Sequence, residues 1–142
     1  MKKLFFIIVC FNIVLSANFI RDNAKKVILD TKTNLMWQDN SEAKTKLLKW
    51  TDAINYCESL TLGGYSNWRL PNIRELESIV DINNADPVIV DVFVNVSNNL
   101  YFSSTTNLTL GSDSALLVKF QYGDVLNAPK DNTYNIRCVR NY

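Results

Sequence analysis

Hydrophobic residues divide the chain into a continuous N-terminal run, two segments of helical period and several short runs with the alternation of strands. The N-terminal run spans residues 4–15, follows two lysines and precedes the small residues Ser16 and Ala17. This pattern is typical of a secretory signal peptide, and the run is shorter than the roughly twenty apolar residues of a membrane span. We predict that residues 1–17 are a signal peptide, cleaved after Ser16 or Ala17, with an uncleaved N-terminal anchor as the alternative.

The segment that follows is polar, and we expect residues 18–26 to form an irregular lead-in. Two short apolar runs at 27–29 and 35–38 then flank a turn-forming segment at 30–34, which predicts a hairpin that starts a sheet. Residues 40–49 are charged and lack a strong period, so we expect a loop there that can hold a short helical turn.

From Trp50 the apolar spacing changes to three and four, which predicts a first amphipathic helix. Thr51 is its expected N-cap, and Gly63 and Gly64 are expected to stop it. The residues on its apolar face are Trp50, Ala53, Ile54, Cys57 and Leu60. This spacing places Cys57 on the buried side of the helix.

Residues 63–79, GGYSNWRLPNIRELESI, predict a turn, a short extended link and a second helix. Pro71 disfavours helical geometry at the residue before it, and Asn72 with Glu75 matches the capping box that begins a helix. The apolar face of this helix consists of Ile73, Leu76, Ile79 and Val80, and its exit is marked by Asp81 and Asn83.

The rest of the chain reads as strands separated by turns, at 100–105, 115–120, 123–130 and 134–140. Alternation places Leu116, Val118 and Phe120 inward on one strand, and Tyr134, Ile136 and Cys138 inward on the last. A hairpin, two helices and then a run of strands predicts one α+β domain over residues 27–142, with two short helices packed on a small twisted antiparallel sheet.

The charge is nearly balanced, with 15 Lys and Arg against 14 Asp and Glu, which argues against a nucleic-acid partner held by a basic face. The chain has no His, so it lacks the commonest metal ligand and the commonest general base at neutral pH. We therefore expect no metal, no cofactor and no enzymatic activity. A hydrolase that uses paired carboxylates is an alternative that spacing does not support.

Removal of the signal peptide takes away Cys10 and leaves Cys57 and Cys138. Two cysteines in an exported domain admit one intramolecular disulfide, which the compartment favours. Closing a loop of about eighty residues would stabilise the fold by roughly 4 kcal/mol. A reactive thiol is the alternative, but it would lack a neighbouring His.

The turn before the second helix holds the first candidate contacts for a ligand, Tyr65, Asn67 and Trp68; Trp68 could equally belong to the core. Arg69 next to them could grip a carboxylate or sulfate, or it could pair with an acidic residue of the second helix, Glu75 or Glu77, and brace the helix against the sheet. Under the second interpretation Arg69, Glu75, Pro71 and Asn72 are structural residues.

The later strands add basic residues at Lys119, Lys130, Arg137 and Arg140. Because alternate strand residues share a face, Lys119 and Arg137 should point away from the core if Val118 and Cys138 point inward. They could form an anion-binding strip, and a solvated sheet face is the plainer alternative. The acidic residues Asp81, Asp86, Asp91 and Asp124 match no calcium-loop spacing and are expected in solvated turns.

Taken in order, the strings LDTKTNLMWQD, WTDAINYCESLTLGGYSNWRLPNIRELESIVD, LYFSST, ALLVKFQYGDV and IRCVR resemble the Lcl C-terminal domain family, named for the end of a Legionella collagen-like adhesin. The resemblance covers residues 27–140. More remotely, WTDAINYC and WRLPNIRELESI are similar to segments of C-type-lectin-like and formylglycine-generating-enzyme-like domains. In C-type lectins a Cys on the first helix pairs with one on the final strand.

The resemblance implies a C-type-lectin-like fold and an exported, non-catalytic recognition or adhesion module. The implied partner is a glycan or other surface ligand, with a sulfated or acidic polysaccharide as the specific expectation. The contacts expected for it are Tyr65, Asn67, Trp68, Arg69, Lys119, Lys130 and Arg137. The alternative is a structural envelope protein that assembles with itself, and a homo-oligomer is compatible with either function. No membrane span is expected after signal cleavage.

Overall fold

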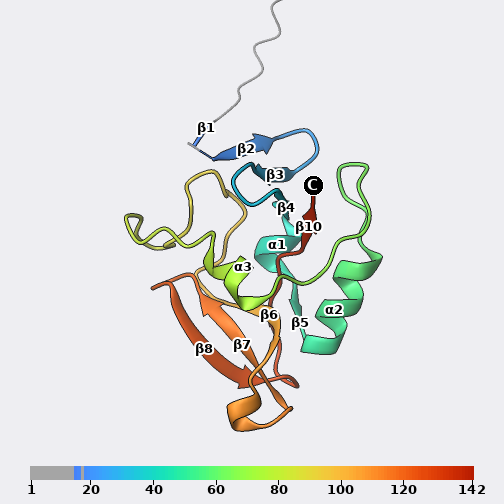
Figure 1. Cartoon of the computed structure of the whole chain (residues 1–142), viewed down its shortest axis with the longest axis vertical. Helices are drawn as coiled ribbons and strands as arrows, with labels where there is room; N and C mark the ends of the chain where they lie inside the picture. Colours follow the sequence, from blue (N-terminus) through green and yellow to red (C-terminus); the bar gives the residue numbers. More distant parts are fainter. Residues whose placement is uncertain (1–14, 17) are drawn as a thin grey trace, which may run out of the picture.

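The computed structural model describes residues 15, 16 and 18–142, so the predicted signal peptide lies almost wholly outside the described residues. The described chain is an α+β domain in which two five-stranded sheets combine with short helices (Figure 1). The strands are β1 (Leu15–Ser16), β2 (Phe19–Asp22), β3 (Val27–Asp30), β4 (Leu35–Gln38), β5 (Leu47–Leu48), β6 (Leu100–Thr106), β7 (Ser114–Lys119), β8 (Asp124–Pro129), β9 (Tyr134–Asn135) and β10 (Val139–Asn141). The helices are α1 (Glu42–Thr45), α2 (Trp50–Ser59), α3 (Ile73–Glu77) and the 3-10 turn η1 (Leu108–Leu110).

The first sheet has the order β1-β2-β3-β4-β10 and contains the predicted hairpin, β3–β4. Its turn forms because Asp30 Oδ1 accepts hydrogen bonds from the backbone N–H groups of Lys32 and Thr33, at 2.9 and 3.3 Å. The prediction of an irregular lead-in at 18–26 is wrong for residues 19–22, which pair with β3 as β2. The physical reason is that Phe19 packs against Phe93 in the core.

The second sheet has the order β5-β9-β6-β7-β8, and all of its pairs are antiparallel except β6 with β9. Figure 1 shows it in the lower part of the molecule, below the first sheet. The strands therefore form two sheets where the sequence predicted one. The division arises because β10 pairs with β4 of the hairpin, whereas β9, only a few residues earlier, pairs with β5 and β6.

The inner strands of both sheets, β3, β4, β6 and β7, are covered on both faces. Neighbouring residues of a strand therefore belong alternately to two clusters, because successive side chains point to opposite faces. The α3-side core includes Leu76, Ile79 and Phe93, whereas the α2-side core includes Ala53, Cys57 and Trp68. The strand pairs that divide between them are Ile28 and Val27, Trp37 and Met36, Tyr101 and Phe102, Val118 and Leu117, and Val139 and Cys138, with the α3-side residue named first.

This double coverage corrects the inward set predicted for residues 115–120. Val118 and Phe120 are buried as expected, but Leu116 is only half-buried. Ala115 and Leu117 are completely buried instead, on the opposite face from Val118. A simple inside–outside alternation fails here because neither face of β7 is open to solvent along its whole length.

The helices form where the sequence indicates, with shifted ends. α2 begins at Trp50, so Thr51 is not its N-cap; the N-cap is Lys49, whose side chain makes no capping bond. The Trp50 N–H donates instead to the Lys130 carbonyl at 3.0 Å, which supplies a partner at the helix start. α3 has the predicted capping box of Asn72 and Glu75 but ends before Ile79, which is nevertheless buried.

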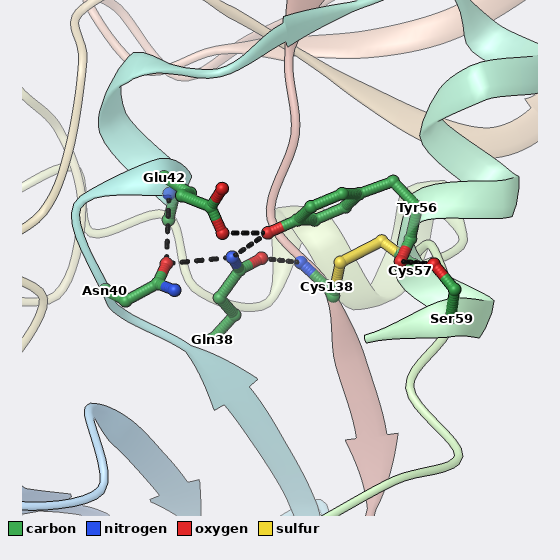
Figure 2. Close-up of a disulfide and its surroundings, with 8 residues drawn as sticks. Gln38, Asn40, Glu42, Tyr56, Cys57, Ser59 and Cys138 are labelled. Carbon is green, nitrogen blue, oxygen red and sulfur yellow. Dashed lines mark hydrogen bonds between the residues drawn. A yellow bond between two sulfur atoms is a disulfide. The ribbon is translucent and has the colours of Figure 1, made fainter. Parts of the chain in front are cut away.

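A disulfide joins Cys57 of α2 to Cys138, beside β10, with 5.5 Å between the Cα atoms. Figure 2 shows the polar network around it. The Cys138 N–H donates to Gln38 Oε1 at 2.9 Å, Gln38 Nε2 donates to the Tyr56 hydroxyl at 3.1 Å, and that hydroxyl donates to Glu42 Oε2 at 2.6 Å. Burial and the bond to Glu42 raise the pKa of Tyr56, so it remains a neutral donor. The network ties α1, β4 and α2 to the segment that leads into β10.

Within residues 15, 16 and 18–142, no helix combines the length and the apolar character that crossing a membrane would require.

Candidate functional site

The turn after α2 holds Tyr65, whose ring contacts Arg140 of β10. Leu62 and Tyr65 exchange backbone hydrogen bonds of 3.0 Å in both directions, and Gly63 and Gly64 between them have φ values of 62° and 82°. Trp68 is buried in the α2-side core, and its indole N–H donates to the Tyr65 carbonyl at 3.0 Å. The structure therefore supports the interpretation of Trp68 as a core residue. Its indole hydrogen bond to the Tyr65 carbonyl stabilises the turn from the core side.

Two cations lie against the ring of Tyr65. Lys25 Nζ is 5.0 Å from the ring centroid and donates to the Tyr65 hydroxyl at 3.1 Å. Arg140 Cζ is also 5.0 Å from the centroid, and its Nε donates to the Ser66 carbonyl at 3.0 Å. We call Lys25, Tyr65 and Arg140 the Tyr65 cluster. Neither cation forms a salt bridge with any residue that the structure describes, although the charge of the nearby Asp22 helps to raise the pKa of Lys25.

Local structure holds Lys25 in this position. Asp22 Oδ1 accepts hydrogen bonds of 3.0 Å from the backbone N–H groups of Ala24 and Lys25, which closes the turn after β2. Gly63 packs so closely that a Cβ there would lie 2.8 Å from the Lys25 Cβ. The hydrogen bond to Tyr65 raises the pKa of the fully exposed Lys25 ammonium, which stays charged at neutral pH.

Arg69 lies next to β10, and its backbone exchanges hydrogen bonds of 2.8 and 2.9 Å with Val139. Its guanidinium donates to both oxygens of Glu75, at 2.7 and 2.8 Å, and to Asn141 Oδ1 at 3.1 Å. Burial alone would raise the pKa of Glu75, but the bonds from Arg69 and from the Asn72 N–H outweigh it and lower that pKa. Arg69 therefore forms the ion pair that braces the second helix against the sheet, and the Glu75 carboxylate neutralises its positive charge.

An open groove of about 640 Å³ runs beside this brace. Arg74 of α3 lines it and is exposed, with no salt bridge to another described residue. Asn141 of β10 lines it as well, directly after Arg140 of the Tyr65 cluster. The complete lining is Thr33, Asn34, Leu35, Arg69, Asn72, Arg74, Glu75, Ser78, Asn141 and Tyr142.

The remaining predicted contacts do not gather around Tyr65. Lys130 lies 3.9 Å above the Trp50 ring at the start of α2 and donates to Thr106 Oγ1 at 2.8 Å, whereas Tyr65 follows the end of that helix. Lys119 lies at the opposite end of the β7–β8 pair from Lys130, with its Nζ 5.1 Å from the Tyr122 ring. Asn67 is exposed in the turn, next to the cluster.

The prediction that Arg137 points away from the core is wrong, because its side chain is completely buried. It donates to Asp39 Oδ1 at 2.8 Å and to the carbonyls of Gln38 and Asn95 at 2.6 Å each. Phe93 covers the guanidinium at 4.8 Å. Since the face opposite Cys138 is packed rather than solvated, Arg137 has a structural position and is closed to a ligand.

Sequence reasoning missed Lys25 and the buried Asp39. Lys25 falls in the segment predicted to be irregular, although the Asp-Asn-Ala-Lys-Lys sequence at 22–26 is a turn signal that is compatible with a paired strand before it. Asp39 follows an apolar strand directly, and no local signal distinguishes it from a solvated turn residue. Arg140 was recognised as basic, but its approach to Tyr65 depends on contacts between segments distant in sequence.

The fold and this surface define a small, disulfide-bonded α+β domain with a cationic and aromatic cluster in which Lys25 is exposed and Tyr65 and Arg140 are half-buried. The sequence matches the family model of the Lcl C-terminal domain over residues 26–140, and the chain belongs to this family. The family is associated with adhesins, which agrees with a recognition or adhesion role. No curated protein matches the chain significantly.

Proposed function

We propose that this protein is an exported, non-catalytic adhesion module that binds an acidic glycan through the Tyr65 cluster. The observation that carries the proposal is the pair of cations, Lys25 and Arg140, each 5.0 Å from the centroid of the half-buried Tyr65 ring and without a salt bridge to any described residue. A guanidinium and an ammonium both donate to sulfate or carboxylate groups, and an aromatic ring offers a face for a sugar. Family membership supports the adhesive role.

The groove beside Arg69 extends this surface. Arg140 and Asn141 are consecutive in β10, so the Tyr65 cluster and the groove border the same strand on its two faces. A polymeric ligand that contacts Arg140 could continue across the strand to Arg74, while Arg69 offers hydrogen bonds rather than net charge. Such a repeating acidic chain fits better than a small anion, because the cationic residues Lys25, Arg140 and Arg74 come from three separate segments of the chain.

Export and a C-type-lectin-like architecture belong to the same proposal. The Cys57–Cys138 disulfide supports export, since disulfides persist in oxidising compartments, and it joins the first long helix to the final strand region as that architecture requires.

The absence of catalysis is supported by the carboxylates Glu42 and Glu75. Their partners, Tyr56 and Arg69 foremost, lower their pKa values, which is the opposite of what a general acid needs.

Binding of the full-length gene product, as processed by its host, to heparin and to desulfated heparin tests the proposal. We expect salt-sensitive binding to the sulfated polymer, weakened about tenfold or more in the double variant Lys25→Ala/Arg140→Ala, because charged hydrogen bonds are lost. The matched control is Lys44→Ala/Lys49→Ala, which removes the same charge from exposed residues elsewhere. No binding at low salt, or an equal loss in both double variants, would refute the proposal.

A further inference from the structure

The outer edge of β8 is an open strand edge. In the sheet order β5-β9-β6-β7-β8, β8 is terminal, and Figure 1 shows it at the outside of the lower sheet. Five of its six residues are exposed, including Val125 at 39% and Leu126 at 43%. A six-residue edge with apolar side chains is a template for pairing with another strand.

The ladder with β7 determines which backbone groups face outward. Lys130 N–H donates to the Asp113 carbonyl at 2.8 Å, and the β7–β8 register continues this pairing with Ala128 opposite Ala115 and Leu126 opposite Leu117. Since hydrogen-bonded pairs recur at every second residue of an antiparallel ladder, the N–H and C=O groups of the alternate residues point away from β7. These outward residues are Val125, Asn127 and Pro129.

The side chains along this edge are complementary to a second copy of themselves. The strand has an acidic residue at one end, Asp124, and Lys130 just beyond the other, with Asn127 midway. If two copies pair antiparallel about Asn127, Asp124 meets the partner's Lys130, and Leu126 lies opposite the partner's Ala128. Neither Asp124 nor Lys130 forms a salt bridge within the described chain. The Lys130 ammonium contacts the Trp50 ring and the Thr106 hydroxyl, which are both uncharged, so its positive charge still lacks a counter-ion that the partner's Asp124 would supply.

We propose that the protein forms a symmetric dimer in which two β8 edges pair antiparallel about Asn127, joining two second sheets into one. The two Asn127 backbones exchange both N–H···O bonds, and each Val125 N–H donates to the partner's Pro129 carbonyl. Pro129 has no N–H of its own, so the added ladder ends there. The pairing uses the same edge in both copies, so it closes as a dimer and does not propagate. This interaction is independent of the Tyr65 cluster and would make glycan binding bivalent.

Light scattering during size exclusion, over a range of concentrations, tests the assembly with the full-length gene product as its host processes it. We expect twice the monomer mass at high concentration. Asn127→Pro removes only an outward N–H and should weaken dimerisation about tenfold or more, because two central hydrogen bonds are lost. A monomer at every concentration, or a folded Asn127→Pro variant that dimerises as before, would overturn the proposal.

Disulfide crosslinking tests the register even if the proline variant folds poorly. In the proposed pairing the two Asn127 Cα atoms are about 5.5 Å apart, within disulfide range, whereas the two Val125 residues are separated by more than about 13 Å. Asn127→Cys should therefore give a crosslinked dimer on oxidation and Val125→Cys should not. Equal crosslinking of both variants, or crosslinking of Val125→Cys alone, would contradict this interface.

Discussion

Asp39 is the counter-ion of two buried arginines, Arg21 and Arg137. Its carboxylate is completely buried, forms salt bridges with Arg21 and Arg137, and accepts backbone N–H bonds from Val94 and Asn95 at 3.2 Å each. One residue thus connects β2, β4, the segment before β10 and the loop that leads into β6. Two guanidiniums share this single carboxylate, and the carbonyls of Val92, Gln38 and Asn95 accept further hydrogen bonds from them. Arg21 Nε donates to the Asn23 side chain, and the buried Arg137 Nε has no hydrogen-bond partner among the described residues.

Asp39→Ala should lower the free energy of unfolding by about 3–5 kcal/mol, because it leaves two buried guanidiniums without their counter-ion. Urea denaturation at neutral pH measures the difference. Lys46→Ala is the control, since it breaks the partly exposed Lys46–Glu42 pair, whose atoms are 3.1 Å apart, and should cost no more than about 1 kcal/mol. Similar losses in the two variants would contradict the role assigned to Asp39.

The Arg69–Glu75 brace predicts a pH dependence. Because the folded pKa of Glu75 is lowered from its usual value near 4.5, its contribution to stability is present above that value and is lost as the pH falls through the folded pKa. Glu75→Gln keeps a side chain suited to the capping box but removes the charge. At neutral pH this variant should be less stable by up to about 1 kcal/mol, the modest value reflecting the partial exposure of Arg69.

Denaturation at a series of pH values checks this expectation. The difference between the native protein and Glu75→Gln should shrink in acid, below the usual carboxyl pKa of 4.5. A gap that stays constant from neutral pH into acid would show that the charge of Glu75 does not stabilise the fold.

At the scale of elements, the turn after α2 connects the core to the candidate site. Trp68 supports it from the core, and Gly63 faces Lys25 of the turn after β2. The position of Lys25 over Tyr65 therefore depends on the absence of a side chain at residue 63.

Gly63→Ala should weaken glycan binding and destabilise the fold more than Gly64→Ala. Both glycines have positive φ values, so both substitutions introduce backbone strain of about 1 kcal/mol or more. A Cβ at Gly63 would also meet the Lys25 Cβ at 2.8 Å, whereas nothing lies within 4 Å of a Cβ at Gly64. Binding to sulfated glycan and urea midpoints measure the two effects, and equal binding by the two variants would show that the contact with Lys25 is unimportant.

Local patterns predicted the elements that depend on neighbouring residues. The β3–β4 hairpin, the apolar face of α2 and the capping box of α3 all follow from spacing within a few positions. The disulfide followed from compartment and from the number of cysteines. These features could be predicted because their determining residues lie close together or allow only one arrangement.

The incorrect predictions share a different cause. The positions of Arg137, Leu116 and β2 depend on which segments cover the second face of each sheet, and that covering comes from distant parts of the chain. Alternation indicates two faces but does not say that both are buried. For the same reason the Tyr65 cluster could not be foreseen, since Lys25, Tyr65 and Arg140 come from three separate regions.

At the scale of the whole molecule, the folded unit begins before the matched family region. The family model covers residues 26–140, but β2 pairs with β3 over its full length, and its Arg21 completes the buried cluster around Asp39. Phe19 also covers Phe93, with 6.0 Å between ring centroids. Residues 19–22 are therefore part of the domain.

A chain that starts at residue 26 should be less stable than one that starts at residue 18 by at least about 3 kcal/mol, because it loses a partner of the buried Asp39 together with a core aromatic residue. Urea midpoints of the two chains, compared at the same pH, measure the difference. Equal midpoints would mean that β2 adds nothing to the folded unit.

β10 has a further consequence for how the protein acquires its function. Its Val139 pairs with Trp37, which lies 102 positions earlier (139 − 37), and the same short segment supplies Arg137, Cys138 and Arg140. Closure of so long a loop makes this contact a late event in folding. If the chain is exported in order from its N-terminus, as proposed, it cannot build the buried ion cluster, the disulfide or the Tyr65 cluster until Arg137, Cys138 and Arg140, respectively, have emerged. Under the proposed function, the domain would therefore bind its ligand only once it is complete, and incomplete chains would not compete for that ligand.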